Sequence, residues 1–244
     1  MMLPGEYETM FAREDSYWWY EGLRRLVLAS LADLGARGKL RILDAGCGTG
    51  GLLGSLPDGS WGVDIADTGI RYCRRRGLSR LVQSSVTRLP FRAGAFDAVI
   101  SLDVLYHQWV ADDLEGLREF RRVLVPGGTV IVNLPAYEFM RSEHDAAILT
   151  RRRYTRAELA EKLRASGFRP VHLTYRNTVL FPLALLVRRW RRNERPGAAP
   201  RSDLVTLPAW LNRALLAVVD VENWIVRRAP LPFGLSLYCV AQKA

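Results

Sequence analysis

Residues 39–51 read KLRILDAGCGTGG, and this stretch decides the fold of the chain. The first seven residues form an apolar run of strand length, which the glycine cluster ends. Glycine permits a tight turn and a close approach of the backbone to a ligand, and a helix that begins after such a turn presents free N–H groups. The stretch therefore predicts a buried strand that leads into a ligand-binding turn and a helix.

Apolar segments of strand length recur along the chain, at residues 61–65, 80–83, 95–102, 129–134, 168–175 and 235–241. Segments whose apolar residues have helical spacing lie between several of them, as at residues 112–125 and 156–165. Strands joined by crossover helices form a parallel sheet with helices on both faces. The sequence thus predicts an α/β fold with a doubly wound, mostly parallel, seven-stranded sheet.

The chain reads as a single domain of residues 1–244 with two additions to its core. The core comprises residues 39–175 and 233–244. Residues 1–38 precede it and contain the aromatic run Tyr17-Trp18-Trp19-Tyr20. Residues 176–232 form a helical insertion before the last strand, with helices predicted at residues 179–192 and 208–228.

Composition excludes several classes of protein. Of the 244 residues, 49% are hydrophobic and 25% are charged, so the chain can form a core. Three widely spaced cysteines predict neither a disulfide scaffold nor a metal site. No apolar run approaches the ~20 residues of a membrane span. Acidic residues near the N-terminus, where a signal peptide is positively charged, predict a cytoplasmic protein.

The net charge of +10 raises the question of a nucleic-acid partner. Lysine accounts for only three of the 35 basic residues, Lys39, Lys162 and Lys243, and the rest are arginine. This skew is typical of GC-rich coding, and no helix-turn-helix, RNP-like or zinc-finger pattern accompanies it. The sequence therefore predicts no nucleic-acid partner.

Glycine spacing alone leaves the ligand of the turn open. Gly46, Gly48 and Gly51 satisfy G-x-G-x-x-G, and Asp64 stands near the position of the ribose-binding acid of dinucleotide enzymes. Asp44 favours a different ligand, because a carboxylate just before the glycines would repel a pyrophosphate and attract a cation. A cationic ligand with an amino-acid group therefore fits better than a dinucleotide.

Further landmarks follow in a fixed order: residues 89–91 (LPF), 96–101 (FDAVIS) and 122–128 (RVLVPGG). With the glycine turn, they make residues 39–134 resemble class I S-adenosylmethionine (SAM)-dependent methyltransferases, in particular the type 11-like subgroup. The resemblance implies a Rossmann-like fold, SAM as cofactor, and methyl transfer to a small-molecule or lipid-like acceptor. Two alternatives are an NAD-type oxidoreductase on the same glycine turn and a non-methylating protein on a methyltransferase scaffold.

The resemblance also implies a cofactor site. It places the glycine turn beneath the methionine part of SAM, Asp64 on the ribose hydroxyls and Ile65 on the adenine. Ser85 stands where an acid usually contacts the adenine amino group. The cofactor-binding residues are then Asp44, Gly46, Cys47, Gly48, Gly50, Asp64, Ile65, Ser85, Val86 and Leu102.

Candidate residues for chemistry and acceptor binding lie around this site. His107 follows the fourth predicted strand, where open α/β sheets bind ligands, and His144 follows the fifth. Each is a candidate general base, and the alternatives are a helix-cap or packing role for His107 and a loop anchor for His144. Trp18, Trp19, Tyr106 and Tyr137 are the candidate acceptor contacts; for the first two, packing of an N-terminal helix is the alternative.

The predicted helix at residues 179–192 is apolar at first and then carries Arg188, Arg189, Arg191 and Arg192. Its place before the last strand puts it on the acceptor side of the fold in this resemblance. Three roles fit it: peripheral contact with an anionic membrane, a cover for the pocket, or a homodimer interface. The predicted partner is a small-molecule or lipid-linked acceptor.

Overall fold

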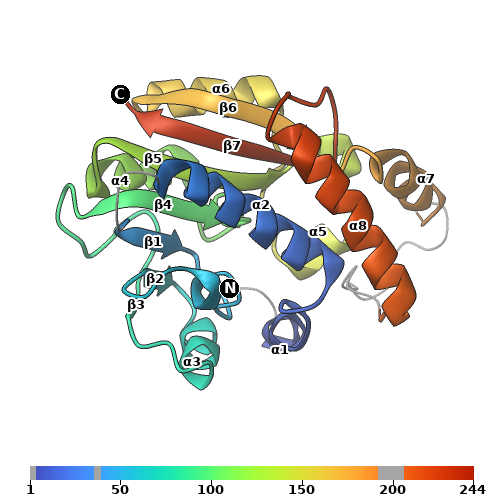
Figure 1. The fold of residues 1–244 in the computed structure, drawn as a ribbon, viewed down its shortest axis with the longest axis horizontal. Helices are drawn as coiled ribbons and strands as arrows, with labels where there is room; N and C mark the ends of the chain where they lie inside the picture. The colour runs from blue at the N-terminus through green and yellow to red at the C-terminus, as the bar shows by residue number, and fades with distance from the viewer. Residues whose placement is uncertain (1–3, 36–39, 192–205) are drawn as a thin grey trace.

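The computed structural model describes residues 4–35, 40–191 and 206–244, and it contains one seven-stranded sheet (Figure 1). The strand order is β3-β2-β1-β4-β5-β7-β6; β7 runs antiparallel to both of its neighbours, and the other pairs are parallel. This confirms the predicted doubly wound, mostly parallel sheet. The strands are β1 (Ile42–Ala45), β2 (Trp61–Asp64), β3 (Leu81–Gln83), β4 (Phe96–Leu102), β5 (Leu124–Pro135), β6 (Phe168–Arg176) and β7 (Ser236–Lys243).

Helices cover both faces of the sheet because neighbouring strand residues point to opposite sides. Val99 and Ile100 of β4, for example, belong to two different core clusters. The Val99 cluster lies under α4 (Asp113–Val123) and α6 (Arg156–Ala165), and the Ile100 cluster lies under α2 (Trp18–Leu34), α3 (Asp67–Arg75) and α8 (Ala209–Val226). Figure 1 shows α2 and α8 in front of the sheet and α6 behind it.

The segment after β1 differs from the predicted helix. It consists of turns and a 3-10 helix, η2 (Leu53–Ser55). Gly46, Gly48 and Gly50 have φ values of 92°, 53° and 89°, which a right-handed helix does not contain. Every second residue of the turn from Gly46 to Gly50 thus has a positive φ, so this segment is not a helix.

Three helices lie beyond the carboxyl-terminal ends of the parallel strands: α1 (Pro4–Arg13), α5 (Glu143–Ala147) and α7 (Phe181–Arg191) (Figure 1). A second 3-10 helix, η3 (Glu138–Met140), precedes α5. Helices α7 and α8 form the predicted insertion between the last two strands; the predicted helix end at Arg192 and strand start at Lys39 lie outside the described residues.

The insertion packs on α2 through a close helix contact. A Cβ atom at Gly22 would lie 2.5 Å from Val219 Cγ1 of α8, so glycine allows the two helices to approach. The Asn223 side chain donates to the Gly22 carbonyl at 2.8 Å, and the Asn212 side chain accepts from the Trp18 N–H at 3.0 Å. The start of α2 is thus fixed by α8.

Within the described residues, no helix is long and apolar enough to cross a membrane. The same residues contain no cluster of His, Cys, Asp and Glu side chains that could hold a metal ion.

Candidate active site

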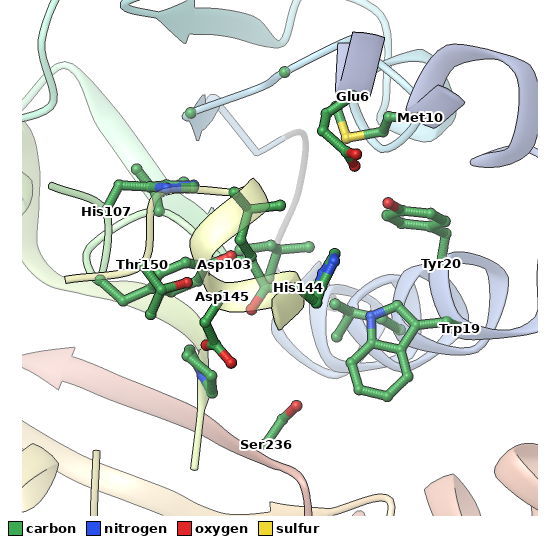
Figure 2. Close-up of a pocket in the computed structure, with 18 of the residues that line it drawn as sticks. Glu6, Met10, Trp19, Tyr20, Asp103, His107, His144, Asp145, Thr150 and Ser236 are labelled. Atoms are coloured by element: carbon green, nitrogen blue, oxygen red, sulfur yellow. The ribbon is translucent and has the colours of Figure 1, made fainter. Parts of the chain in front are cut away.

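A cavity of about 1520 Å³ opens at the carboxyl-terminal edge of the parallel strands (Figure 2). Its walls come from the glycine turn, the ends of β2, β4 and β5, and helices α1, α2, α5 and α7. Pockets for one small ligand measure roughly 300–1,000 Å³, so this cavity has room for a cofactor and an acceptor together. Most predicted site residues line it: Trp18, Trp19, Asp44, Gly46, Cys47, Gly48, Asp64, Ile65, Ser85, Val86, Leu102, Tyr106, His107 and His144.

The glycine turn forms the floor of the cavity at two positions. A Cβ atom at Gly46 would collide with the Val104 side chain, and one at Gly48 would lie 2.6 Å from Met10 Cε of α1. Gly50, in contrast, does not line the cavity. A Cβ atom there would lie 3.0 Å from Cys73 Sγ, so Gly50 serves the packing of the turn on α3.

The Asp64 carboxylate is fixed by the backbone of the turn. Its Oδ2 accepts from the Gly48 N–H at 2.9 Å and its Oδ1 from the Ala66 N–H at 2.8 Å. Each oxygen keeps a second lone pair for a ligand hydroxyl. Burial raises the pKa of Asp64, although these N–H groups oppose the shift. The arrangement can accept two hydrogen bonds from a vicinal diol such as ribose.

Asp44 is a buried acid among the residues that line the cavity. The residue is 2% exposed, and its Oδ2 has no hydrogen-bond partner among the described residues. Burial raises its pKa to about 8, and the nearby carboxylates of Asp64 and Glu14 add to the shift. A cationic ligand would reverse this shift, which fits the positive charges of SAM.

Four predicted cofactor residues lie along the rim between the glycine turn and β4. Ile65 is 42% exposed and offers an apolar face beside Asp64. Ser85 Oγ is engaged with Thr87, from which it accepts the N–H at 3.2 Å and whose hydroxyl lies 2.8 Å away. Val86 and Leu102 complete this side of the cavity.

Asp103, directly after β4, is a site residue that was not among the candidate bases named from the sequence. It lines the cavity, and its φ of 56° places a non-glycine residue in the left-handed region, a strained conformation that is common at functional sites. Its Oδ1 accepts from the Asn133 amide at 2.9 Å. Burial raises its pKa to about 6, against this hydrogen bond and the charges of Arg176 and Arg153. At neutral pH it is a carboxylate poised to accept a proton.

The two predicted histidines line different parts of the cavity. Burial lowers the pKa of His107 to about 4, so its imidazole is neutral and weakly basic at pH 7. Figure 2 shows His107 away from Trp19 and Tyr20, whereas His144 extends from α5 toward them. The geometry and pKa values therefore favour Asp103 over His107 as a base, and His144 stays a candidate.

The aromatic run at the start of α2 lines the cavity and also packs. The Trp18 and Trp19 rings meet edge to face at 5.5 Å, and both residues belong to the cavity wall. Tyr106 also lies on the wall, but Tyr137 does not. The Tyr137 ring stacks on Tyr175 at 5.1 Å instead, so the prediction that it contacts the acceptor is not supported by its position.

The far end of the cavity is apolar. Leu180, Leu183, Ala184 and Val187 follow the i, i+3, i+4, i+7 pattern of one helix face, and Leu215 of α8 adds to them. The cavity thus joins a polar, acidic part at the glycine turn to an apolar part under the insertion.

The strand order, the glycine turn after β1 and the acid at the end of β2 agree with the resemblance to class I SAM-dependent methyltransferases. Residues 43–132 match the family described as "Methyltransferase domain". This part of the chain is therefore a SAM-dependent methyltransferase domain, as the resemblance implied.

Individual relatives agree on the domain and differ in the acceptor they name. The chain is 38% identical over 112 residues to a tRNA (carboxymethyluridine(34)-5-O)-methyltransferase of Arabidopsis thaliana, covering 45% of this chain and 26% of the relative. It is 40% identical over 110 residues to a demethylmenaquinone methyltransferase of Beutenbergia cavernae, covering 43% of this chain and 44% of the relative. The matches thus span less than half of these relatives.

Among solved structures, an SAM-dependent methyltransferase of Thermotoga maritima shares the fold with a TM-score of 0.58 at 17% identity, covering 98% of this chain and 95% of that one. At this identity, the likeness concerns the fold alone.

The prediction of no nucleic-acid partner is wrong as an exclusion, because tRNA methyltransferases are among the relatives. It rested on the missing nucleic-acid-binding motifs. Such motifs are not required when a catalytic core is shared and surrounding segments bind the acceptor.

Proposed function

We propose that this chain transfers the methyl group of SAM to a hydroxyl or amine of an acceptor whose apolar body lies between α2 and α7. The observation that carries the proposal is the single cavity, which is acidic at the glycine turn and apolar at Leu180, Ala184 and Leu215. Its size accommodates both molecules. SAM supplies an electrophilic methyl group on a sulfonium centre when bound.

The proposal assigns separate roles to the acidic residues and to the tryptophans of the cavity. Asp64 accepts the ribose hydroxyls, and Asp44 meets the positive charge of the cofactor with its free oxygen. Asp103 accepts the proton of the acceptor nucleophile, and the Asn133 amide holds its carboxylate in place. Trp18 and Trp19 exclude water from the acceptor side.

A binding and turnover assay tests the proposal. S-adenosylhomocysteine (SAH) is expected to bind and to raise the melting temperature, whereas NADH is not. The protein is then incubated with methyl-labelled SAM and extracts that separate lipid-soluble from water-soluble acceptors, and label is expected in the lipid-soluble fraction. Absence of SAH binding would contradict the proposal.

Methylation of tRNA is the second candidate, because the curated relatives include tRNA methyltransferases and the chain carries a net charge of +10. The same labelled cofactor with total tRNA distinguishes the two candidates. Label in tRNA that nuclease digestion releases, with none in the lipid-soluble fraction, would support the tRNA candidate and contradict an apolar acceptor.

A further inference from the structure

Arg176, the last residue of β6, is a buried cation, and two of its guanidinium nitrogens make no hydrogen bond within the described residues. The residue is 1% exposed, and among the described residues neither Nε nor Nη1 has a hydrogen-bond partner. A buried charge is costly unless it is paired, and unsatisfied buried donors are rare in folded proteins. An unsatisfied buried guanidinium therefore suggests a role in function.

Arg176 is not itself among the residues that line the cavity, but two of its neighbours are. Arg176 is the register partner of Ser236 at the start of β7, and paired residues on neighbouring strands point to the same face. Ser236 lines the cavity, and Figure 2 shows it below Asp145. The Trp19 ring, which also lines the cavity, lies 5.8 Å from Arg176 Cζ. Arg176 therefore lies behind the cavity wall, beside Trp19 and Ser236.

Protein acids near Arg176 compensate its charge without satisfying its donors. Glu222 of α8 is buried, but its two oxygens accept from the backbone N–H groups of Asn177 and Val179. Asp103 interacts with Arg176 through charge alone and has one oxygen engaged by Asn133. Burial lowers the pKa of Arg176, and these two carboxylates oppose the shift. The protein thus holds the guanidinium in place and leaves its Nε and Nη1 without a hydrogen-bond partner among the described residues.

We propose that Arg176 binds an anionic group of the acceptor, a carboxylate or a phosphate, at the end of the cavity next to Trp19 and Ser236. The planar fork of donors suits either oxyanion, and such charge-assisted bonds are among the strongest hydrogen bonds in proteins. The inference rests on the proposed function and narrows its acceptor to an amphipathic anion. Leu180, Ala184 and Leu215 would contact the apolar part.

Binding of three twelve-carbon probes tests this inference. Dodecanoate, dodecyl phosphate and dodecanol share one chain length and differ in the head group. Their dissociation constants are measured by quenching of tryptophan fluorescence, with SAH at saturation. We expect at least one of the two anions to bind about tenfold or more tightly than dodecanol. Preference for one anion over the other identifies the head group as carboxylate or phosphate.

The Arg176→Met variant is the decisive comparison, because it keeps the length of the side chain and removes the charge. Replacing a buried charge by an apolar side chain need not destabilise the fold, and SAH binding checks that the variant is folded. We expect it to lose the tenfold preference while its affinity for dodecanol stays within about twofold. Arg227→Met is the matched control, since Arg227 pairs with Asp33 on the surface at 3.0 Å.

Equal binding of anions and alcohol by the wild type, no measurable binding of either anion, or a preference that survives Arg176→Met would each overturn the inference. Failure of the wild type to bind SAH is a separate result, which contradicts the proposed function itself. A shift in the pH profile of Arg176→Met without any change in anion preference would assign the residue to the electrostatics of Asp103 and overturn the anion site.

Discussion

The Asn133 amide of β5 donates to the Asp103 carboxylate at 2.9 Å, and the Asn133 carbonyl accepts the Asp103 N–H at the same distance. Two neighbouring strands thereby fix both the backbone and the side chain of a residue with a φ of 56°. The carboxylate is held at the end of β4, among the residues that line the cavity, with Oδ1 engaged by Asn133.

This pair gives the first prediction. Asp103→Asn should lower the rate of methyl transfer about 100-fold or more, because a general base contributes about 10²–10⁴. SAH affinity should stay within about threefold, since Asp103 is not a cofactor contact in our assignment. Equal losses of rate and SAH affinity would instead indicate a structural role. His107→Ala is the comparison, for which we expect the smaller loss of rate.

The pH profile gives a second prediction from the same residue. The pKa of Asp103 is raised to about 6, and the base acts as the carboxylate. The rate should therefore rise with pH below about 6 and level off above it. Asn133→Ala removes a bond that stabilises the carboxylate, so the midpoint of the profile should move to higher pH. A midpoint near pH 4 in the wild type would point to His107 instead.

The glycine turn and the alternation of strands and helices could be predicted from the sequence because they depend on local patterns. The role of Asp103 as a base was not predicted, because the sequence shows neither its left-handed backbone conformation nor the burial that raises its pKa. For Tyr137 the sequence predicted a cavity contact that the structure does not contain. Its position after β5 suggested the cavity, but its ring stacks on Tyr175, a partner that only the register of β6 brings near. An acid at the end of a central parallel strand was the available signal for Asp103.

Removal of the Asp64 carboxylate should weaken cofactor binding. Asp64→Ala takes away two acceptors for the ribose hydroxyls, and hydrogen bonds to charged groups contribute about 1.5–3 kcal/mol each. We expect SAH to bind about 2–3 kcal/mol more weakly in calorimetric titration. Asp67→Ala is the control, because Asp67 lies nearby at the start of α3 and pairs on the surface with Arg71. An unchanged dissociation constant for Asp64→Ala would contradict the ribose assignment.

Asp44→Asn should stabilise the free protein at alkaline pH while reducing its affinity for SAH. Burial raises the pKa of Asp44 to about 8, so the folded state holds a proton that the unfolded state has released above about pH 4. Stability of the wild type therefore falls as pH rises from about 4 to about 8. Asparagine does not titrate, and the melting temperature of the variant should exceed that of the wild type by an amount that grows over this window, at about 2–4 °C per kcal/mol. A difference that is constant with pH would contradict the raised pKa.

Filling the apolar end of the cavity should block the acceptor without affecting the cofactor. Ala184 of α7 lines the cavity between Leu180 and Val187, so Ala184→Trp adds a large ring to that space. We expect KM for an apolar acceptor to rise about tenfold or more, or turnover to be lost, with SAH affinity unchanged. Leu186→Trp is the matched control, because Leu186 is 67% exposed on the same helix and does not line the cavity. Normal acceptor kinetics in Ala184→Trp would place the acceptor elsewhere, and an equal loss in both variants would indicate that the change acts through α7 as a whole.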